Sequence, residues 1–388
     1  MAEKQNTPEI RFEGFTDPWE QRKLGNCGTT YGGLTGKTKE DFGHGNAKFV
    51  PYTNVFDNPL TDTKRLEAVE IDSSQNQVAY GDVFFTVSSE TPDEVGMSSV
   101  WLSDQEDVYL NSFCFGYRQD STFDPHYLAY MLRSSSVRSN LTLLAQGISR
   151  FNISKNKVME LSIPVPSAVE QKQLGQYFTK LDDLITLHQR KYDKLCTVKK
   201  SMLDKMFPKP GETEPEIRFG GFTDPWEQRK FLDVVDVCSG KDYKHLKEGS
   251  IPVYGTGGFM TSVDEALSYD RDAVGIGRKG TIDKPYLLKA PFWTVDTLFY
   301  AIPKSDIDLE FVHCSFLNVD WKSKDESTGL PSLSKEAINE TIALVPSFDE
   351  QSQLGEFFNN LDSFITLHQR KLELLRNIKK SLLDRMFV

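Results

Sequence analysis

The sequence predicts an α+β protein: two globular domains separated by two long antiparallel helices in a coiled coil, with a pseudo-two-fold internal repeat. Segment 170–207 returns as segment 350–387, with 23 of 38 positions identical. Segment 8–24 returns as segment 215–231, with 15 of 17 positions identical. The residues between these repeats do not match. The repeated segments are called the frame below, and the residues between them in each half are called the insert. Each half is therefore expected to hold a different insert within the same frame.

The two long repeats have the apolar spacing of coiled-coil helices, alternating between four and three residues. Because the halves are copies, we expect their helices to pack antiparallel about a pseudo-two-fold axis, with His188 and His368 close together near it. The alternative is two ordinary seam histidines that each bond elsewhere. The seam positions are Leu174, Phe178, Leu181, Ile185, Tyr192, Leu195, Met202 and Met206, and then Leu354, Phe358, Leu361, Ile365, Leu372, Leu375, Leu382 and Met386.

The inserts predict mixed, strand-rich domains. Their β-branched and aromatic runs are bounded by turn residues, which is typical of strands, and segments 123–135 and 308–318 are predicted helices. The predicted strands are 48–56, 81–89, 110–118, 162–166, 250–254, 273–276, 292–302 and 342–346.

These predictions divide the chain into five parts. The two globular domains are placed at 8–166 and 215–346, and the two helices at 167–207 and 347–388. Segment 208–214, PKPGETE, has nothing to bury and is predicted to be an exposed linker.

Composition excludes several classes of protein. The net charge is −11 and 38% of residues are hydrophobic, with no apolar run near the ~18 residues of a membrane span. The polar N-terminus has no signal segment, so we expect a cytoplasmic location. The five cysteines lack metal-binding spacing, and no metal site is predicted. No phosphate-binding loop, nucleophile elbow or zinc-protease motif is present, so no catalytic residue is proposed.

Taken together, these segments resemble the specificity (S) subunit of type I restriction-modification enzymes over essentially the whole length. The frame carries EIRFxGFTDPWEQRK at the start of each half and EQxQLGxxF…LDxxITLHQRK at the end. The first insert holds looser versions of that family's motifs. The second insert holds IPVYGTGGF at 251–259, GIGRKGTI at 275–282, PFWTVDTLFY at 291–300 and GLPSLSKEAI at 329–338.

The resemblance implies a function. In that family each insert is a target recognition domain that reads one half of a bipartite double-stranded DNA sequence. The helices set the spacer between the halves and dock two methyltransferase (M) subunits, which modify adenine with S-adenosylmethionine. Nuclease-translocase (R) subunits complete the complex. The S subunit is non-catalytic and binds no cofactor directly; S-adenosylmethionine, ATP and Mg2+ belong to its partners.

Base reading needs hydrogen-bonding side chains on loops that reach a groove, and phosphate contacts need cations, hydroxyls or free amides. Where the second insert has GRKG, the first has TVSSE, which lacks both positive charges. The candidate DNA-binding residues are Arg278, Lys279, Thr281, Tyr254, Gly255, Thr256, Gly257, Ser332, Ser334, Lys37, Lys39, Tyr52, Thr53, Asn54, Thr86, Ser88, Arg150 and Asn152.

Two other classes remain open: a stand-alone bipartite DNA-binding regulator and a protein scaffold with no DNA role. The regulator would need more positive charge, whereas segment 28–160 has 11 basic and 17 acidic residues. We therefore expect tight DNA binding only when methyltransferase subunits also hold the duplex.

Overall fold

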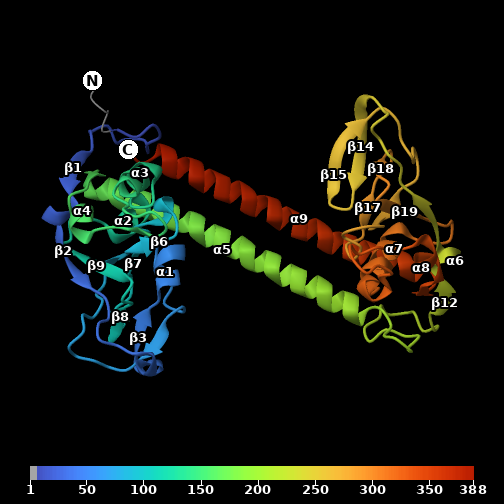
Figure 1. Cartoon of the computed structure of the whole chain (residues 1–388), viewed down its shortest axis with the longest axis horizontal. Helices are drawn as coiled ribbons and strands as arrows, with labels where there is room; N and C mark the ends of the chain where they lie inside the picture. Colours follow the sequence, from blue (N-terminus) through green and yellow to red (C-terminus); the bar gives the residue numbers. More distant parts are fainter. Residues whose placement is uncertain (1–6) are drawn as a thin grey trace. The chain divides into compact units, whose positions relative to one another are not determined.

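The computed structural model describes residues 7–388, which form two compact units. Unit 1 consists of the chain up to His188 together with Lys371–Val388, and unit 2 is Gln189–Arg370. The long helices α5 (Ala168–Lys205) and α9 (Phe348–Arg385), green and red in Figure 1, therefore each contribute one end to each unit. The predicted α+β class and the packed pair of long helices are confirmed. In the part of the chain that is described, no helix is long and apolar enough to cross a membrane.

Unit 1 contains an antiparallel sheet in the order β2-β9-β5-β7 and a smaller sheet in the order β4-β3-β8, in which β3 and β8 run parallel. Its elements are β1 Glu20–Lys23, β2 Gly28–Gly32, β3 Phe42–Val50, α1 Tyr52–Asp57, β4 Glu67–Val69, β5 Val83–Thr86, β6 Ser88–Ser89, β7 Ser98–Val100, β8 Val108–Leu110, β9 Cys114–Gln119, α2 Pro125–Met131, α3 Ser135–Leu143, β10 Phe151–Asn152, α4 Lys155–Met159 and β11 Ser162–Val165.

Unit 2 repeats this topology, although the insert sequences do not match. Its sheets have the orders β13-β19-β16-β17 and β15-β14-β18, and β14 again runs parallel to β18. Its elements are β12 Glu227–Lys230, α6 Phe231–Val234, β13 Val235–Ser239, β14 Glu248–Gly255, β15 Gly258–Val263, β16 Ala273–Gly277, β17 Tyr286–Leu288, β18 Trp293–Thr294, β19 Leu298–Pro303, α7 Leu309–Leu317, α8 Lys335–Glu340 and β20 Ile342–Val345.

Four predicted strands are wrong in part. The predicted strand 81–89 divides into β5 and β6, and the predicted strand 110–118 is interrupted between β8 and β9. The predicted strand 48–56 ends at Val50, because Pro51 has no amide to continue the ladder. The carbonyl of Pro51 instead accepts from the amide of Asn54 at 3.1 Å and begins α1. The predicted strand 292–302 is interrupted by a turn in which the amide of Leu298 donates to the carbonyl of Val295 at 3.0 Å.

The repeated frame is joined to each long helix in the same way. A short antiparallel ladder pairs β1 with β11, and β12 pairs with β20 in the same register. The guanidinium of Arg11 then donates twice to the buried carboxylate of Glu170, at 2.7 and 2.8 Å. Arg218 and Glu350 form the same bidentate pair at the same distances. Breaking such a buried pair leaves an uncompensated charge, so it fixes the frame to the helix start.

An aromatic cluster in unit 1 joins the frame, the domain and both long helices. Phe387, in the residues that follow α9, lies 5.4 Å from the ring of Phe178 in α5 and 5.8 Å from Tyr127 in α2. Trp19 of the frame packs edge-on against Phe387 at 6.4 Å. Residues at the end of the second half therefore complete the core of the first domain.

Unit 2 has the equivalent cluster with the halves exchanged. Phe207, just past the end of α5, packs against Phe311 at 5.8 Å and Phe358 at 6.3 Å. Trp226 lies edge-on to Phe207 at 5.5 Å. Each domain therefore depends on residues that the other half of the chain supplies.

The charged residues of the seam show the direction of helix packing. In unit 1 the ammonium of Lys379 in α9 contacts Asp182 in α5 at 2.5 Å. In unit 2 Lys199 in α5 contacts Asp362 in α9 at 2.6 Å. Each pair joins the N-terminal half of one helix to the C-terminal half of the other, as the predicted antiparallel arrangement requires. The proximity of His188 and His368 stays a prediction.

Truncating Phe387 should destabilise unit 1 and spare unit 2. Phe387→Ala removes a buried ring, which in a core costs about 3–5 kcal/mol. We expect amide hydrogen exchange to quicken in α2 and β11 and to stay unchanged in α7 and β20. Phe207→Ala should give the reverse pattern, and the exposed Leu374→Ala on α9 should change neither. Equal quickening of both units would contradict this arrangement.

Candidate nucleic-acid interface

Four of the predicted residues in the first domain line one hollow. Tyr52 and Thr53 come from α1, Ser88 from β6, and Arg150 from the loop before β10, and together with aromatic and acidic neighbours they surround a volume of about 760 Å3. The four are far apart in sequence, and the fold brings them together. This hollow is called the first groove below.

Hydrogen bonds hold the walls of the first groove. The hydroxyl of Tyr52 donates to the carbonyl of Ser88 at 2.8 Å, and a guanidinium nitrogen of Arg150 donates to the Ser88 hydroxyl at 3.2 Å. The ring of Tyr52 stacks on Phe56 at 5.9 Å. Burial raises the pKa of Tyr52, so its hydroxyl stays protonated at neutral pH. Arg150 is exposed and can turn toward a ligand.

Four predicted residues in the second domain also share one hollow. Arg278 and Lys279 follow β16, and Ser332 and Ser334 precede α8, around a volume of about 360 Å3 that we call the second groove. Both cations are exposed. The guanidinium of Arg278 lies over the ring of Phe299 at 5.8 Å, which orients it without neutralising its charge.

The two grooves border equivalent loops of the two domains. In the first, the amide of Ile153 donates to the carbonyl of Val87 at 2.9 Å. In the second, the amide of Leu333 donates to the carbonyl of Arg278 at 2.9 Å. Arg278 therefore stands where the first domain has Val87. At these two positions the second domain has the cations Arg278 and Lys279, whereas the first domain has the uncharged Val87 and Ser88.

Ser334 has a structural role beside its place in the second groove. Its hydroxyl accepts from the amide of Ala337 at 3.0 Å and so caps the N-terminus of α8. The same hydroxyl donates to Glu326 at 3.0 Å. Ser332 is half-buried, and its amide donates to Asp325 at 2.9 Å.

Residues Tyr254, Gly255, Thr256 and Gly257 form the end of the hairpin between β14 and β15. The hydroxyl of Tyr286 donates to the carbonyl of Gly255 at 2.6 Å, and Gly255 itself is buried. Thr256 and Gly257 are the turn of this hairpin and do not line the second groove. Thr281 is half-buried beyond Gly280 and does not line it either.

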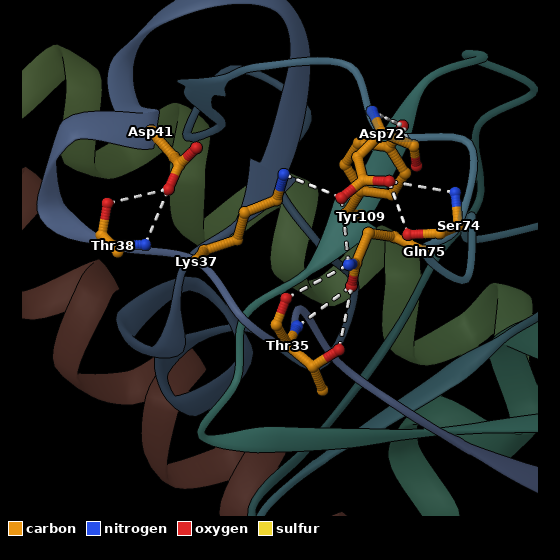
Figure 2. A network of polar contacts seen from close by, with 8 residues as sticks. All are labelled: Thr35, Lys37, Thr38, Asp41, Asp72, Ser74, Gln75 and Tyr109. Atoms are coloured by element: carbon orange, nitrogen blue, oxygen red, sulfur yellow. Dashed lines mark hydrogen bonds and ion pairs between the residues drawn. The ribbon is translucent and has the colours of Figure 1, made fainter.

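Lys37 belongs to a polar network away from both grooves, and Figure 2 shows it directed at Asp72. Its ammonium lies 2.8 Å from that carboxylate, and only 13% of the Lys37 side chain is exposed. This ion pair raises the pKa of Lys37, and it is the largest cause of the lowered pKa of Asp72. Lys37 is thus held by an internal partner, whereas Lys39 is exposed on the same loop.

Two predicted contacts in the first domain are buried. The side-chain amide of Asn54 donates to the carbonyls of Asp62 and Arg65, at 2.9 and 3.0 Å. The hydroxyl of Thr86 accepts from the amide of Met97 at 3.0 Å. Asn54 lies in α1 and Thr86 lies at the end of β5, and both side chains bond to buried backbone groups. Neither side chain can therefore reach a nucleic acid. Asn152 is exposed beside Ser88, with which it pairs.

Sequence reasoning missed the acidic residues of both grooves. Glu90 and Glu94 line the first groove, and Glu326 and Glu336 line the second. Glu90 lies two residues after the predicted Ser88, so its place in the sequence was a usable signal. Carboxylates accept hydrogen bonds from the exocyclic amine of cytosine, which makes them possible base readers. Within residues 7–388, no group of three or more potential ligands could hold a metal ion.

Comparison with known proteins places this arrangement in a family. The profile of the Type I restriction modification DNA specificity domain matches residues 16–196 and again residues 223–377, most of the chain. The chain belongs to the family of type I restriction-modification specificity subunits. Such a subunit is the non-catalytic part of the type I complex.

Two relatives of this specificity subunit come from Methanocaldococcus jannaschii. The Type I restriction enzyme MjaVIII specificity subunit is 24% identical over 69% of this chain and 70% of its own. The Putative type I restriction enzyme MjaX specificity subunit is 20% identical over 98% and 95%. The crystal structure of the type I restriction-modification S subunit from M. genitalium shares the fold, with a TM-score of 0.69, 17% identity, and coverage of 98% and 99%.

Asn54 and its neighbour Thr53 should separate a structural role from a surface role. Asn54→Ala leaves buried carbonyls unpaired, which costs about 1–3 kcal/mol. The exposed Thr53→Ala should stay within about 0.5 kcal/mol of the parent. Thermal unfolding of the two variants is the measurement. A loss with Thr53→Ala as large as that with Asn54→Ala would contradict the placement of these side chains.

Proposed function

We propose that each β-rich domain of this specificity subunit reads one half of a bipartite DNA target. The observation that carries the proposal is a groove beside equivalent loops in each copy of one repeated fold. The repeated frame segments are identical at 15 of 17 and 23 of 38 positions, whereas the groove residues differ. A duplicated frame with different reading surfaces fits the recognition of two different half-sites.

The chemistry of the grooves supports different half-sites. Arg278 and Lys279 offer the second groove donors that favour the acceptors of guanine, and Arg binds guanine in a bidentate manner. The first groove instead combines Arg150 with the carboxylates of Glu90 and Glu94. Those carboxylates would repel phosphates and suit an exocyclic amine at a base edge. The first domain alone should therefore bind DNA weakly.

The helix surfaces support docking of two copies of one partner. Leu184 and Leu187 of α5 are exposed in unit 1, and Phe364 and Leu367 of α9 are exposed in unit 2. These residues occupy the same positions of the repeat, 180 residues apart. Exposed apolar residues at repeated positions favour two equal sites for one kind of subunit. We assign them to two methyltransferase subunits, and the helices to a fixed spacer between the half-sites.

The chemical steps then belong to the partners. Adenine methylation with S-adenosylmethionine is assigned to the methyltransferase subunits, and ATP- and Mg2+-dependent translocation and cleavage to the nuclease-translocase subunits. This chain contributes sequence recognition of double-stranded DNA and the surface on which those subunits assemble.

A genome-wide map of adenine methylation, made with and without the gene for this chain, tests the proposal. We expect one bipartite motif with an unread central spacer to lose its methylation on deletion. A stand-alone DNA-binding regulator would leave the map unchanged and shift DNA on a gel without partners. A protein scaffold would do neither, and an unchanged map would overturn the proposal.

Arg278→Ala should relax one position of the motif. Loss of a bidentate contact to guanine costs about 1–3 kcal/mol at that base pair. Binding of duplexes that differ at each position, with the methyltransferase complex present, measures this. Lys335→Ala, which removes an exposed cation on the same groove, is the matched control and should weaken all duplexes alike. Unchanged affinity of Arg278→Ala for every duplex would remove Arg278 from the site.

A further inference from the structure

One aliphatic side chain of the first domain, that of Ile148, is almost fully exposed to solvent. Ile148 has 98% of its surface exposed, more than any other large hydrophobic residue of residues 7–388. It lies in the loop that also carries Ser149 and Arg150, two residues that line the first groove. Contact with an apolar group of a ligand would remove this side chain from water, which is favourable.

The loop that carries Ile148 is held in shape. The amide of Gln146 donates to the carbonyl of Asn152, and the amide of Asn152 donates back to Gln146, both at 2.9 Å. Gly147 has a φ of +145°, and a Cβ there would collide with the carbonyl of Arg150. The branched side chain of Ile148 has restricted χ1 freedom. The loop therefore presents a stiff apolar group at a fixed place.

The second domain has a similar feature on the equivalent loop. Leu330 is 66% exposed and lies just before Ser332 of the second groove. Its neighbour Pro331 is fixed by its carbonyl, which accepts from the amide of Gly280 at 2.8 Å. The insert sequences differ, yet both loops next to a groove expose one large aliphatic side chain.

The chemistry of DNA narrows what such a group can read. Base edges and phosphates are polar, and the C5-methyl group of thymine in the major groove is the apolar exception. Polar neighbours such as Arg150 suit the hydrogen-bonding edges beside it. An aliphatic group placed among such readers discriminates thymine from cytosine by contact with that methyl.

We propose that Ile148 and Leu330 each contact the C5-methyl group of a thymine in the half-site that their own domain reads. The proposal rests on the proposed function. It assigns to each domain one specificity-determining residue that recognises thymine by apolar contact rather than by hydrogen bonding.

Replacement of thymine by deoxyuridine tests the proposal, because it removes only the methyl group. The complete chain, assembled with its methyltransferase subunits, is titrated with target duplexes in which each thymine is replaced in turn. We expect one replacement in each half-site to weaken binding about three- to fivefold, the scale of one buried methyl group. Ile148→Ala should abolish the effect in the first half-site only, and Leu330→Ala in the second only.

The controls separate this proposal from the proposed function. Leu143→Ala, 83% exposed at the end of α3 in the same domain, should leave both deoxyuridine effects intact. All three variants should unfold at the parent temperature because the side chains are exposed. Sequence-specific binding with no deoxyuridine effect, or an effect that Ile148→Ala leaves intact, would overturn the proposal alone. Loss of all sequence-specific binding by the parent complex would overturn the proposed function with it.

Discussion

The structure depends on one constraint: the core of each domain is closed by residues from the other half of the chain. Phe387 fills the cluster around Trp19, and Phe207 fills the one around Trp226. Large aromatic rings dominate core energetics, so neither domain is complete without the end of the opposite helix. Neither half of the chain is therefore expected to form a complete domain core without the other half.

This constraint explains why the repeats are so nearly identical at their ends. Frame residues contact the domain, the start of one long helix and the end of the other, so few substitutions are tolerated there. Arg11, for example, donates two hydrogen bonds to Glu170 at the start of α5. The inserts meet this requirement at fewer positions, such as Tyr127 and Phe311, which pack against Phe387 and Phe207. Loops on a rigid scaffold can vary, and binding functions concentrate there. The structure thus separates the residues that hold the frame from the loops to which we assign DNA recognition.

The sequence predicted what periodicity and duplication determine. The long helices, the antiparallel seam and the strands before each helix were found, because heptad spacing and repeated segments report directly on them. The turn into α1 was missed, since Pro51 was counted within an apolar run. The burial of Asn54 and the ion pair of Lys37 depend on partners distant in sequence. No single-sequence pattern reveals such partners.

The candidate site was predicted only in part, for the same reason. Tyr52, Ser88 and Arg150 were chosen by residue type, and only the fold shows that they share a groove. Glu90 was not among the candidate residues, and only the fold places its carboxylate in the first groove. The exposure of Ile148 follows from a hairpin closed by backbone hydrogen bonds, which leave no signature in the sequence.

The most direct test of the account is to make the two inserts identical within the natural frame. A chimera that replaces residues 25–161 by residues 232–341 would keep both frame segments and both long helices and would present the second groove twice. With its methyltransferase subunits, this chimera should methylate a motif made of two copies of the second half-site, with the spacer unchanged. A folded, assembled chimera that still recognises the original first half-site would contradict the claim that the inserts read and the frame only holds.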